Sequence, residues 1–294
     1  MQVRLLIFRT FLLLQLTCLA TGSGMDPSTT IISVAIIGLG RRSLRHAIPK
    51  ISKLSSMFKI VAACDSDAVA RQSFSDRLPT VPCFETVQEL ALWKQSTYSV
   101  QCAYIAIPHS EYAGVIEVLI GMKVHILKEK PAALSEEELC SFQGQANVGN
   151  VRLMTASQCR YSQRLCRLRE WLPFVGEPRF VEGTRAIDCT DLGEGWRAQN
   201  AKAGGGALND IGWHLVDTVI GLFANPDQVP RISHSELITT RCHQRYDTED
   251  TAFVYLKVPK DIYGCSSKGI RKTKRGERCR LNYRPMISCC NPSL

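Results

Sequence analysis

Residues 31–48 read IISVAIIGLGRRSLRHAI, and this stretch decides the fold of the first half of the chain. The apolar run Ile31–Ile37 is typical of a buried strand and leads into a glycine turn, after which a helix-like segment begins. Gly38 permits a tight turn, and Gly40 lets the backbone approach a pyrophosphate without a Cβ in the way. The helix N-terminus would present free N–H groups to the anion. The pattern predicts a dinucleotide site, although an ordinary strand-to-helix turn can carry the same glycines. The predicted cofactor-binding residues here are Gly38, Leu39, Gly40, Arg41 and Arg42, the two arginines because their charge would lie beside the phosphates.

Asp65 adds a second element of the same site. It follows the strand-like run Phe58–Ala63 and lies 27 residues after Gly38. A carboxylate at the end of the second strand can accept hydrogen bonds from both hydroxyls of an adenosine ribose, and it repels a 2′-phosphate. Taken alone, Asp65 could also be a solvated turn residue. In this position it favours NAD as the cofactor, with NADP as the alternative.

The order of the remaining segments predicts two domains. Between Thr30 and Val151, short apolar runs alternate with amphipathic segments, which indicates βαβ units and a parallel sheet covered on both faces. Longer strand-like runs after this block suggest a second, α+β domain. The predicted strands are Ile31–Ile37, Phe58–Ala63, Ala103–Ile107, Val124–Leu127, Val151–Ala156, Pro178–Ile187, Arg231–Thr239 and Thr251–Val258. The predicted divisions are an extension at 1–29, a Rossmann-type domain at 30–150, an α+β domain at 151–258 and a basic tail at 259–294.

The charge of the chain says little about the folded part. The formal net charge is +9 over 294 residues, but most of the excess of lysine and arginine lies beyond Val258. The body is therefore nearly neutral, which disfavours nucleic acid as a partner. The 13 cysteines contain no CxxC pair and no spacing typical of metal ligands, so we expect mostly free thiols and no metal.

The first 24 residues allow two interpretations. A short basic start, an apolar stretch and small residues near Ala20 are typical of a secretory signal peptide, and the stretch is too short for a membrane span. However, Arg9 interrupts the apolar stretch, and Met25 offers a second start just before the first strand. The protein would be secreted in the first case and cytoplasmic in the second, and the sequence leans slightly to the cytoplasm.

Residues 124–131, VHILKEKP, place a base and an acid at the end of a buried strand. In α/β sheets ligands bind at the carboxyl ends of the strands, and a proline fixes the backbone there. Lys130 could bind a substrate oxygen and carry positive charge to a reacting centre. A surface strand end is the alternative interpretation.

Residues 204–217, GGGALNDIGWHLVD, form the third candidate segment. On a helix Asp210, His214 and Asp217 are spaced four and then three residues apart, so they share one face. A carboxylate near an imidazole can set its tautomer and raise its basicity, which is how a general base near neutral pH is made. Spacing alone leaves three interpretations open: a general base, a merely structural histidine, and a metal site built from the three side chains.

Taken in order, GLGRRS, CDSD, EKP and GGGALNDIGWHLVD resemble the Gfo/Idh/MocA oxidoreductase family over about Ile31 to Val258. The family includes glucose–fructose oxidoreductase and inositol dehydrogenase. Smaller matches are Ala106-Ile107-Pro108 at the end of a predicted strand, Cys159-Arg160-Tyr161, and Gly195-Trp196-Arg197 before the glycines. The resemblance implies a Rossmann domain that binds NAD(P), followed by an α+β domain with a large, mainly antiparallel sheet.

The resemblance also implies a reaction and roles for residues. Hydride would pass between the nicotinamide and a carbinol carbon of a sugar, cyclitol or related polyol. Lys130, Asp210 and His214 would form the catalytic group, with His214 taking the hydroxyl proton. Glu129, Ile107 and Pro108 would contact the cofactor, with a cis peptide often preceding Pro131. Arg160, Trp196 and Arg197 would bind substrate, and no metal is expected.

Two departures from the family pattern affect what we expect. Tyr112 stands where the family often has a histidine, and the sheet of the second domain would stop after about three strands. That sheet commonly forms the family's oligomer interface, so a truncated sheet argues against a homo-oligomer. The alternatives to an active dehydrogenase are a non-catalytic NAD(P)-binding regulator of the same fold and a truncated, weakly active family member.

Overall fold

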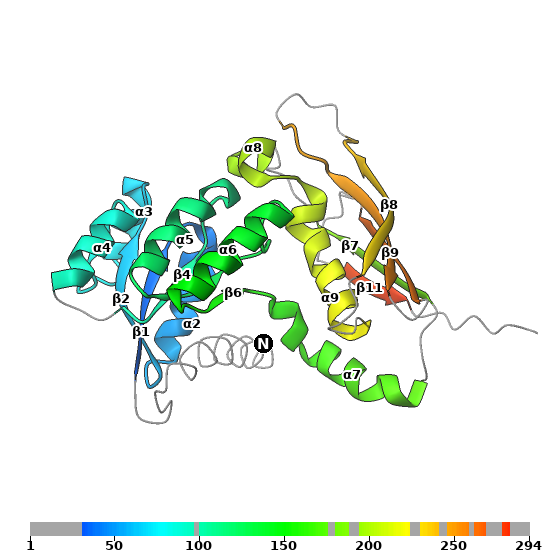
Figure 1. The fold of residues 1–294 in the computed structure, drawn as a ribbon, viewed down its shortest axis with the longest axis horizontal. Coiled ribbons are helices and arrows are strands. Elements are labelled where there is room, and N and C mark those ends of the chain that lie inside the picture. Colours follow the sequence, from blue (N-terminus) through cyan, green and yellow to red (C-terminus); the bar gives the residue numbers. More distant parts are fainter. Residues whose placement is uncertain are drawn as a thin grey trace, which may run out of the picture. The chain divides into compact units, whose positions relative to one another are not determined.

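The computed structural model describes residues 31–96, 100–175, 180–187, 194–223, 230–240, 246–258, 262–268 and 278–282. The predicted signal segment lies outside them. The chain divides into two compact units between Gln158 and Cys159 (Figure 1), some eight residues after the predicted boundary between residues 150 and 151. None of the helices that the structure describes has the length and apolar character needed to cross a membrane.

The first unit contains a parallel sheet with strand order β3-β2-β1-β4-β5-β6. Its strands are β1 (Ile32–Ile37), β2 (Phe58–Cys64), β3 (Cys83–Phe84), β4 (Cys102–Ile105), β5 (His125–Lys128) and β6 (Leu153–Thr155). Its helices are η1 (Ser43–Ala47), α2 (Ile48–Lys53), α3 (Ala68–Ser75), α4 (Val87–Ser96), η2 (His109–Glu111), α5 (Tyr112–Gly121) and α6 (Glu136–Gly149). The predicted strands of this half are confirmed to within two residues at each end, and the short β3 was not predicted.

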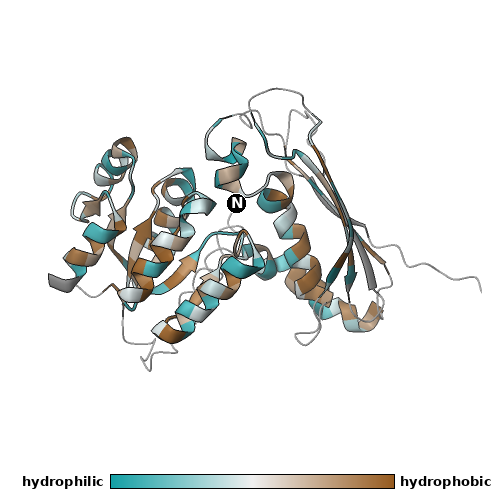
Figure 2. Ribbon diagram, turned by 45° about the horizontal axis from the view of Figure 1, so that its top comes forward, coloured by the Kyte–Doolittle hydropathy of each residue, from teal (hydrophilic) through white to brown (hydrophobic). Residues whose placement is uncertain are grey.

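Strand β1 shows why the sheet is covered on both faces. Side chains alternate along a strand, so Ala35 and Ile37 point to one face and Val34 and Ile36 to the other. All four are buried, and Ala35 and Ile37 belong to the apolar cluster that includes residues of α4, α5 and α6. The helices themselves carry both hydrophobic and hydrophilic residues (Figure 2), as expected of helices with one face on a sheet and the other in water.

The helix after the glycine turn begins with a π-helical turn. The sequence predicts one helix over Leu44–Lys53, whereas the structure has η1 as a π-turn followed by α2. Pro49 lies in the first turn of α2 and has no N–H for an i→i−4 bond. The wider turn before the proline lets the chain continue as a helix into α2.

The second unit contains a mainly antiparallel sheet with strand order β11-β7-β10-β9-β8, in which only the β7–β10 pair is parallel. Its strands are β7 (Phe180–Ala186), β8 (Arg231–Ile238), β9 (Thr251–Val258), β10 (Ile262–Lys268) and β11 (Arg278–Asn282). Its helices are η3 (Gln158–Tyr161, at the boundary), α7 (Gln163–Val175), η4 (Trp196–Ala198), α8 (Asn200–Ala203), η5 (Leu208–Gly212) and α9 (Trp213–Phe223). Helix α9 packs on one face through Val219, which joins Val181, Val254 and Leu256 in a buried cluster.

The expectation that this sheet stops after about three strands is wrong. Strands β10 and β11 lie in the segment that the sequence analysis treated as an unpatterned tail, and β10 lies between β7 and β9. After Ile262 and Tyr263 the strand continues as GCSSK, which has no β-branched or aromatic residue, so the sequence pattern does not reveal it.

Candidate dinucleotide and catalytic sites

Gly38 and Gly40 of the turn are glycines for different structural reasons. Gly38 has a φ of +88°, and a Cβ there would lie 2.3 Å from the carbonyl oxygen of Ala106. The chain just after β4 therefore leaves no room for a side chain at position 38, and Ile107 lies against the same point. A Cβ at Gly40 would meet nothing within 4 Å. The open space beside the Gly40 backbone is where a pyrophosphate would approach, so the turn fits a dinucleotide.

Asp65 is tied directly to this turn. Its Oδ2 accepts a hydrogen bond from the N–H of Leu39 at 2.5 Å, and its Oδ1 accepts one from the N–H of Asp67 at 2.8 Å. The half-buried carboxylate therefore lies at the edge of the glycine turn, as the sequence predicts for a residue that binds the ribose. One side chain both shapes the turn and offers acceptors at its edge.

Arg41 and Arg42 have different surroundings. Arg41 is exposed, whereas the Nε of Arg42 donates to Oε1 of Glu129 at 2.6 Å. The hydroxyl of Tyr104 donates to the same oxygen at 2.7 Å. Burial, the largest single effect, lowers the pKa of Arg42, but the charge of Glu129 together with the interactions with Tyr104 outweighs it, so the pKa is raised. Arg42 was predicted to lie beside the phosphates, but its charge is paired with that of Glu129 within the first unit.

The KEKP segment, residues 128–131, begins at the last residue of strand β5. Lys130 is half-buried, and the Lys130–Pro131 peptide is cis, as the family resemblance implies. Glu129 is buried, and its backbone N–H donates to the carbonyl of Ile105 at 2.8 Å, so the segment continues the parallel pairing of the sheet. Lys130 thus leaves the sheet at its carboxyl edge, where ligands of α/β proteins bind.

In the second unit, the three acidic and imidazole side chains of the predicted helix have separate partners. Oδ2 of Asp210 lies 3.7 Å from Nε of Arg197, and Nδ1 of His214 lies 3.5 Å from Sγ of Cys159. Asp217 is buried and accepts from Nε and Nη2 of Arg160 at 2.8 and 2.6 Å. Of the three, Asp217 therefore has the clearest structural role, and the predicted substrate residue Arg160 is its ion-pair partner.

The predicted common face of Asp210 and His214 is not that of a regular α-helix. Asp210 lies in η5, a π-turn, and His214 lies in the α-helix that follows. Because hydrogen bonds in a π-turn run to the fifth residue instead of the fourth, the four-residue spacing no longer sets one face. Both π-turns of the described chain, η1 and η5, contain or adjoin predicted site residues, and such turns occur often at functional sites.

Glu249 is a residue that sequence reasoning missed. Its carboxylate accepts from the N–H groups of Gly206 and Leu208 at 2.7 and 2.8 Å, and its carbonyl accepts from Ala207 at 2.7 Å. It thus caps the start of the helix that carries Asp210 and His214. No local signal could have found it, because Glu249 lies some forty residues further along the chain.

Trp196 and Arg197 lie together in η4. The guanidinium carbon of Arg197 lies 4.3 Å from the centre of the Trp196 ring, and the Arg197 side chain is 56% exposed. Stacking holds the guanidinium in place while its charge remains accessible. Among the described residues, no group of three or more His, Cys, Asp or Glu side chains could hold a metal ion.

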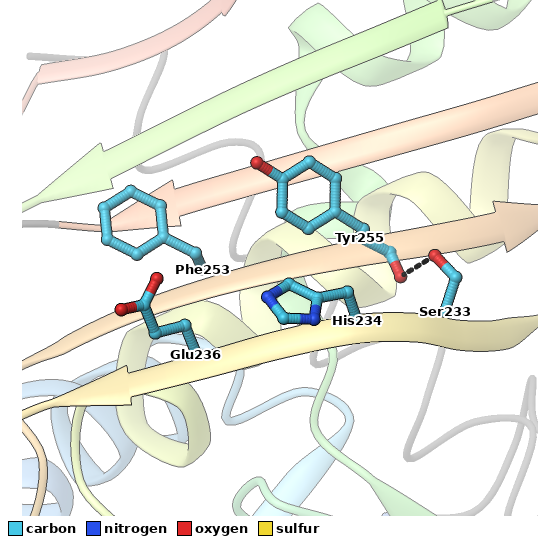
Figure 3. A pocket seen from close by; sticks show the side chains of 5 residues that line it. All are labelled: Ser233, His234, Glu236, Phe253 and Tyr255. Atoms are coloured by element: carbon cyan, nitrogen blue, oxygen red, sulfur yellow. Dashed lines mark hydrogen bonds between the residues drawn. The ribbon is translucent and has the colours of Figure 1, made fainter.

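A hollow on the second sheet lies apart from these residues. Ser233, His234, Glu236, Phe253 and Tyr255 line it on β8 and β9 (Figure 3). Because side chains alternate, Phe253 and Tyr255 face away from α9, toward which Val254 points.

Comparison with known proteins identifies the family. Residues 32–157 match the family profile described as oxidoreductase family, NAD-binding Rossmann fold, and residues 173–281 match the GFO/IDH/MocA C-terminal domain. The chain belongs to the GFO/IDH/MocA family of oxidoreductases. The first match confirms the predicted nicotinamide dinucleotide cofactor, and the second extends through β10 to β11, in agreement with the five-stranded sheet.

Several individual GFO/IDH/MocA proteins resemble the chain. A protein of Amycolatopsis mediterranei named as an oxidoreductase subunit of UDP-kanosamine synthase is 32% identical over 190 residues, which are 64% of this chain and 51% of that protein. An uncharacterised oxidoreductase of Schizosaccharomyces pombe is 23% identical over 283 residues, 90% of this chain and 74% of that protein. The chain spans about half the length of the first two curated relatives that it matches.

Solved structures of the family share the fold. GenD2 of gentamicin A biosynthesis, in complex with NAD, matches with a TM-score of 0.74 and 20% identity, covering 87% of this chain and 70% of that one. The WlbA dehydrogenase of Chromobacterium violaceum, in complex with NADH and UDP-GlcNAcA, matches with a TM-score of 0.73 and 18% identity, covering 85% and 71%. Levoglucosan dehydrogenase, in complex with NADH, matches with a TM-score of 0.72 and 17% identity, covering 86% and 70%.

Proposed function

We propose that this protein is an NAD-dependent dehydrogenase, with NADP as the alternative cofactor, that acts on a CH–OH group of a sugar, cyclitol or related polyol. The observation that carries the proposal is the turn at Gly38–Gly40, with open space beside Gly40 and the Asp65 carboxylate at its edge. The chain also has Lys130, Asp210 and His214, the residue types that hydride transfer from an alcohol requires.

The bound nicotinamide would accept or supply the hydride, and the side chains would handle the proton. Nδ1 of His214 is directed to Cys159, so we assign Nε2 to the hydroxyl proton of the substrate. Lys130 would donate a hydrogen bond to the same oxygen and stabilise the negative charge that develops on it. Asp210, beside Arg197, would orient substrate or imidazole. Arg197 and Trp196 offer a charged and an aromatic surface suited to a sugar-like substrate.

The names of similar proteins support a carbohydrate substrate. WlbA and KijD10 were crystallised with sugar-nucleotide or nucleotide ligands, and levoglucosan dehydrogenase with levoglucosan. These three have under 25% identity to the chain, so they indicate a class and not a compound. We therefore propose a panel of free sugars, cyclitols and nucleotide-linked sugars as the substrates to test.

Two measurements test the proposal in order. Thermal unfolding with NAD and with NADP comes first, and stabilisation by either is expected because a ligand that binds only the folded state raises the transition temperature. Turnover of the panel is then followed at the absorbance of the reduced nicotinamide. His214→Ala should abolish turnover and leave NAD binding intact.

The outcomes separate the alternatives. Stabilisation by NAD with no turnover across the panel would favour the non-catalytic regulator. Absence of stabilisation by either cofactor would overturn the dehydrogenase and the regulator together. Full turnover in His214→Ala would overturn the role assigned to His214.

A further inference from the structure

Lys128 is a fully buried lysine that the proposed reaction does not use. It is the last residue of β5, with 0% of its surface exposed, and it lies two residues before Lys130. Its backbone carbonyl accepts from Ala156 at 2.7 Å, so strand pairing fixes its main chain. Lysines are almost never fully buried unless their charge has partners. The partners of this ammonium group therefore indicate why it is there.

The ammonium group of Lys128 binds the backbone on both sides of Lys130. Its Nζ donates to the carbonyl of Pro131 at 2.5 Å and to that of Glu129 at 3.4 Å. These are the carbonyls of the residues just before and just after Lys130. Hydrogen bonds from a charged donor are stronger than neutral ones, so a single side chain holds this short segment at two points.

Tyr112 completes the same arrangement. Nζ of Lys128 lies 4.0 Å from the centre of the Tyr112 ring, and the Tyr112 hydroxyl donates to the carbonyl of Glu129 at 3.1 Å. The buried ring supplies a π-face for the cation, and His109 stacks against the ring at 5.7 Å between centroids. A histidine, which the family often has at position 112, has a smaller ring and no hydroxyl at this distance. The departure from the family pattern thus accompanies the buried lysine.

We propose that Lys128, with Tyr112, is a positioning residue that fixes the Glu129–Lys130–Pro131 backbone and so sets the direction in which the Lys130 side chain leaves the sheet. The proposal rests on the proposed function, because it concerns how Lys130 reaches the substrate oxygen. Lys128 itself would contact neither substrate nor cofactor and would act through the backbone that carries Lys130.

Charge on Lys128 makes the arrangement sensitive to pH. Burial lowers its pKa from the ordinary 10.5 to about 7, although the charges of Glu138 and Glu129 oppose this. Above that pH the amine is neutral and holds the carbonyls and the ring less strongly. Of the titratable groups on the surrounding elements, Tyr112 lies against the ammonium group, Glu129 and Glu138 act on it through their charge, and His109 stacks on the Tyr112 ring. We therefore expect a decline of kcat above about pH 7 that originates in Lys128.

Lys128→Met tests this, with Lys94→Met as the matched control. Lys94 is a half-buried lysine of the same unit whose Nζ also donates to a backbone carbonyl, that of Met122, away from the KEKP segment. Lys128→Met should lower kcat roughly 10- to 100-fold, as expected of a misplacement near 1 Å, and leave KM for NAD within about threefold. The decline of kcat above pH 7 should be absent in Lys128→Met and retained in Lys94→Met. Tyr112→Phe, which keeps the ring and loses the hydroxyl, should give a smaller fall in kcat.

A second readout keeps this proposal separate from the proposed function. Amide hydrogen exchange of the segment around 126–132, measured in the full chain, should be faster in Lys128→Met and unchanged in Lys94→Met. If the wild-type chain turns over no substrate, the proposed function fails and the exchange measurement alone decides the role of Lys128. Unchanged exchange, or an active Lys128→Met with an unchanged pH profile, would overturn the proposal. Should Lys128→Met not fold, Tyr112→Phe takes its place: a lower kcat with faster exchange of the segment supports the proposal, and unchanged exchange overturns it.

Discussion

Asp65 joins the preference for a cofactor to the shape of the glycine turn. Its Oδ2 holds the N–H of Leu39 at 2.5 Å, and its charge would face the ribose 2′ position. We predict that Asp65→Ala weakens NAD binding at least about tenfold, since one hydrogen bond to a charged group contributes about 1.5 to 3 kcal/mol. NADP should lose less affinity, because the repulsion of a 2′-phosphate is also removed. Calorimetric titration with both cofactors measures the two changes.

Asp67→Ala is the control for Asp65. Asp67 lies in the same loop and caps α3 by accepting from Val69 at 2.8 Å. Its loss should lower stability by about 1 kcal/mol and leave the ratio of the NAD and NADP affinities unchanged. An equal loss of affinity for both cofactors in Asp65→Ala would show that Asp65 only shapes the turn.

Lys128 also predicts how the stability of the first unit depends on pH. Its pKa is about 7 in the folded chain and would return to its ordinary 10.5 on unfolding. Between these values the unfolded chain binds the extra proton, so the free energy of unfolding should rise as the pH rises through this window. Below about pH 7 the cost of the buried charge is fully present. Lys128→Met removes this cost, so the change in transition temperature from wild type to variant should be more favourable at pH 6 than at pH 9. Equal shifts at the two pH values would contradict this prediction.

At the scale of elements, Glu249 controls the start of the helix that carries Asp210 and His214. Its carboxylate satisfies two N–H groups that the helix cannot satisfy itself, those of Gly206 and Leu208. Glu249→Ala should lower the stability of the second unit by about 1 to 2 kcal/mol. Thermal unfolding followed by circular dichroism checks this. Glu236→Ala, an exposed glutamate of β8, is the control and should change little.

Elements whose cause is local could be predicted from the sequence, and those whose cause is distant could not. Apolar runs gave β1, β2, β4 and β5, since a buried strand in a parallel sheet is hydrophobic on both faces. The cap by Glu249 and the pairing of Arg42 with Glu129 join residues far apart in the chain, which no periodicity reports. The π-turn at Leu208–Gly212 likewise has no residue pattern of its own. The predicted shared face of Asp210 and His214 assumed a regular α-helix, which the structure does not have there.

For the whole molecule, the five-stranded sheet of the second unit removes a reason to doubt that the protein forms a homo-oligomer. A sheet that ended with Val258 would have left its strands unpaired, and this was the reason to doubt a homo-oligomer. In the structure β10 pairs with both β7 and β9, and β11 pairs with the other edge of β7. That reason for doubt no longer holds. The segment read as a basic tail supplies one interior strand and one edge strand.

Shortening the chain tests how far the second unit depends on this segment. A chain that ends at Val258 lacks β10, so β7 and β9 lose the strand between them and face each other across a gap with unpaired N–H and C=O groups. We predict that it loses the thermal transition of the second unit and keeps stabilisation of the first unit by NAD, because the proposed cofactor-binding residues all lie in the first unit. A chain that ends at Asn282 retains both strands and should unfold as the full chain does. Calorimetric scans of the three chains with and without NAD distinguish these results. If the chain ending at Val258 keeps both transitions, β10 does not hold the second sheet together.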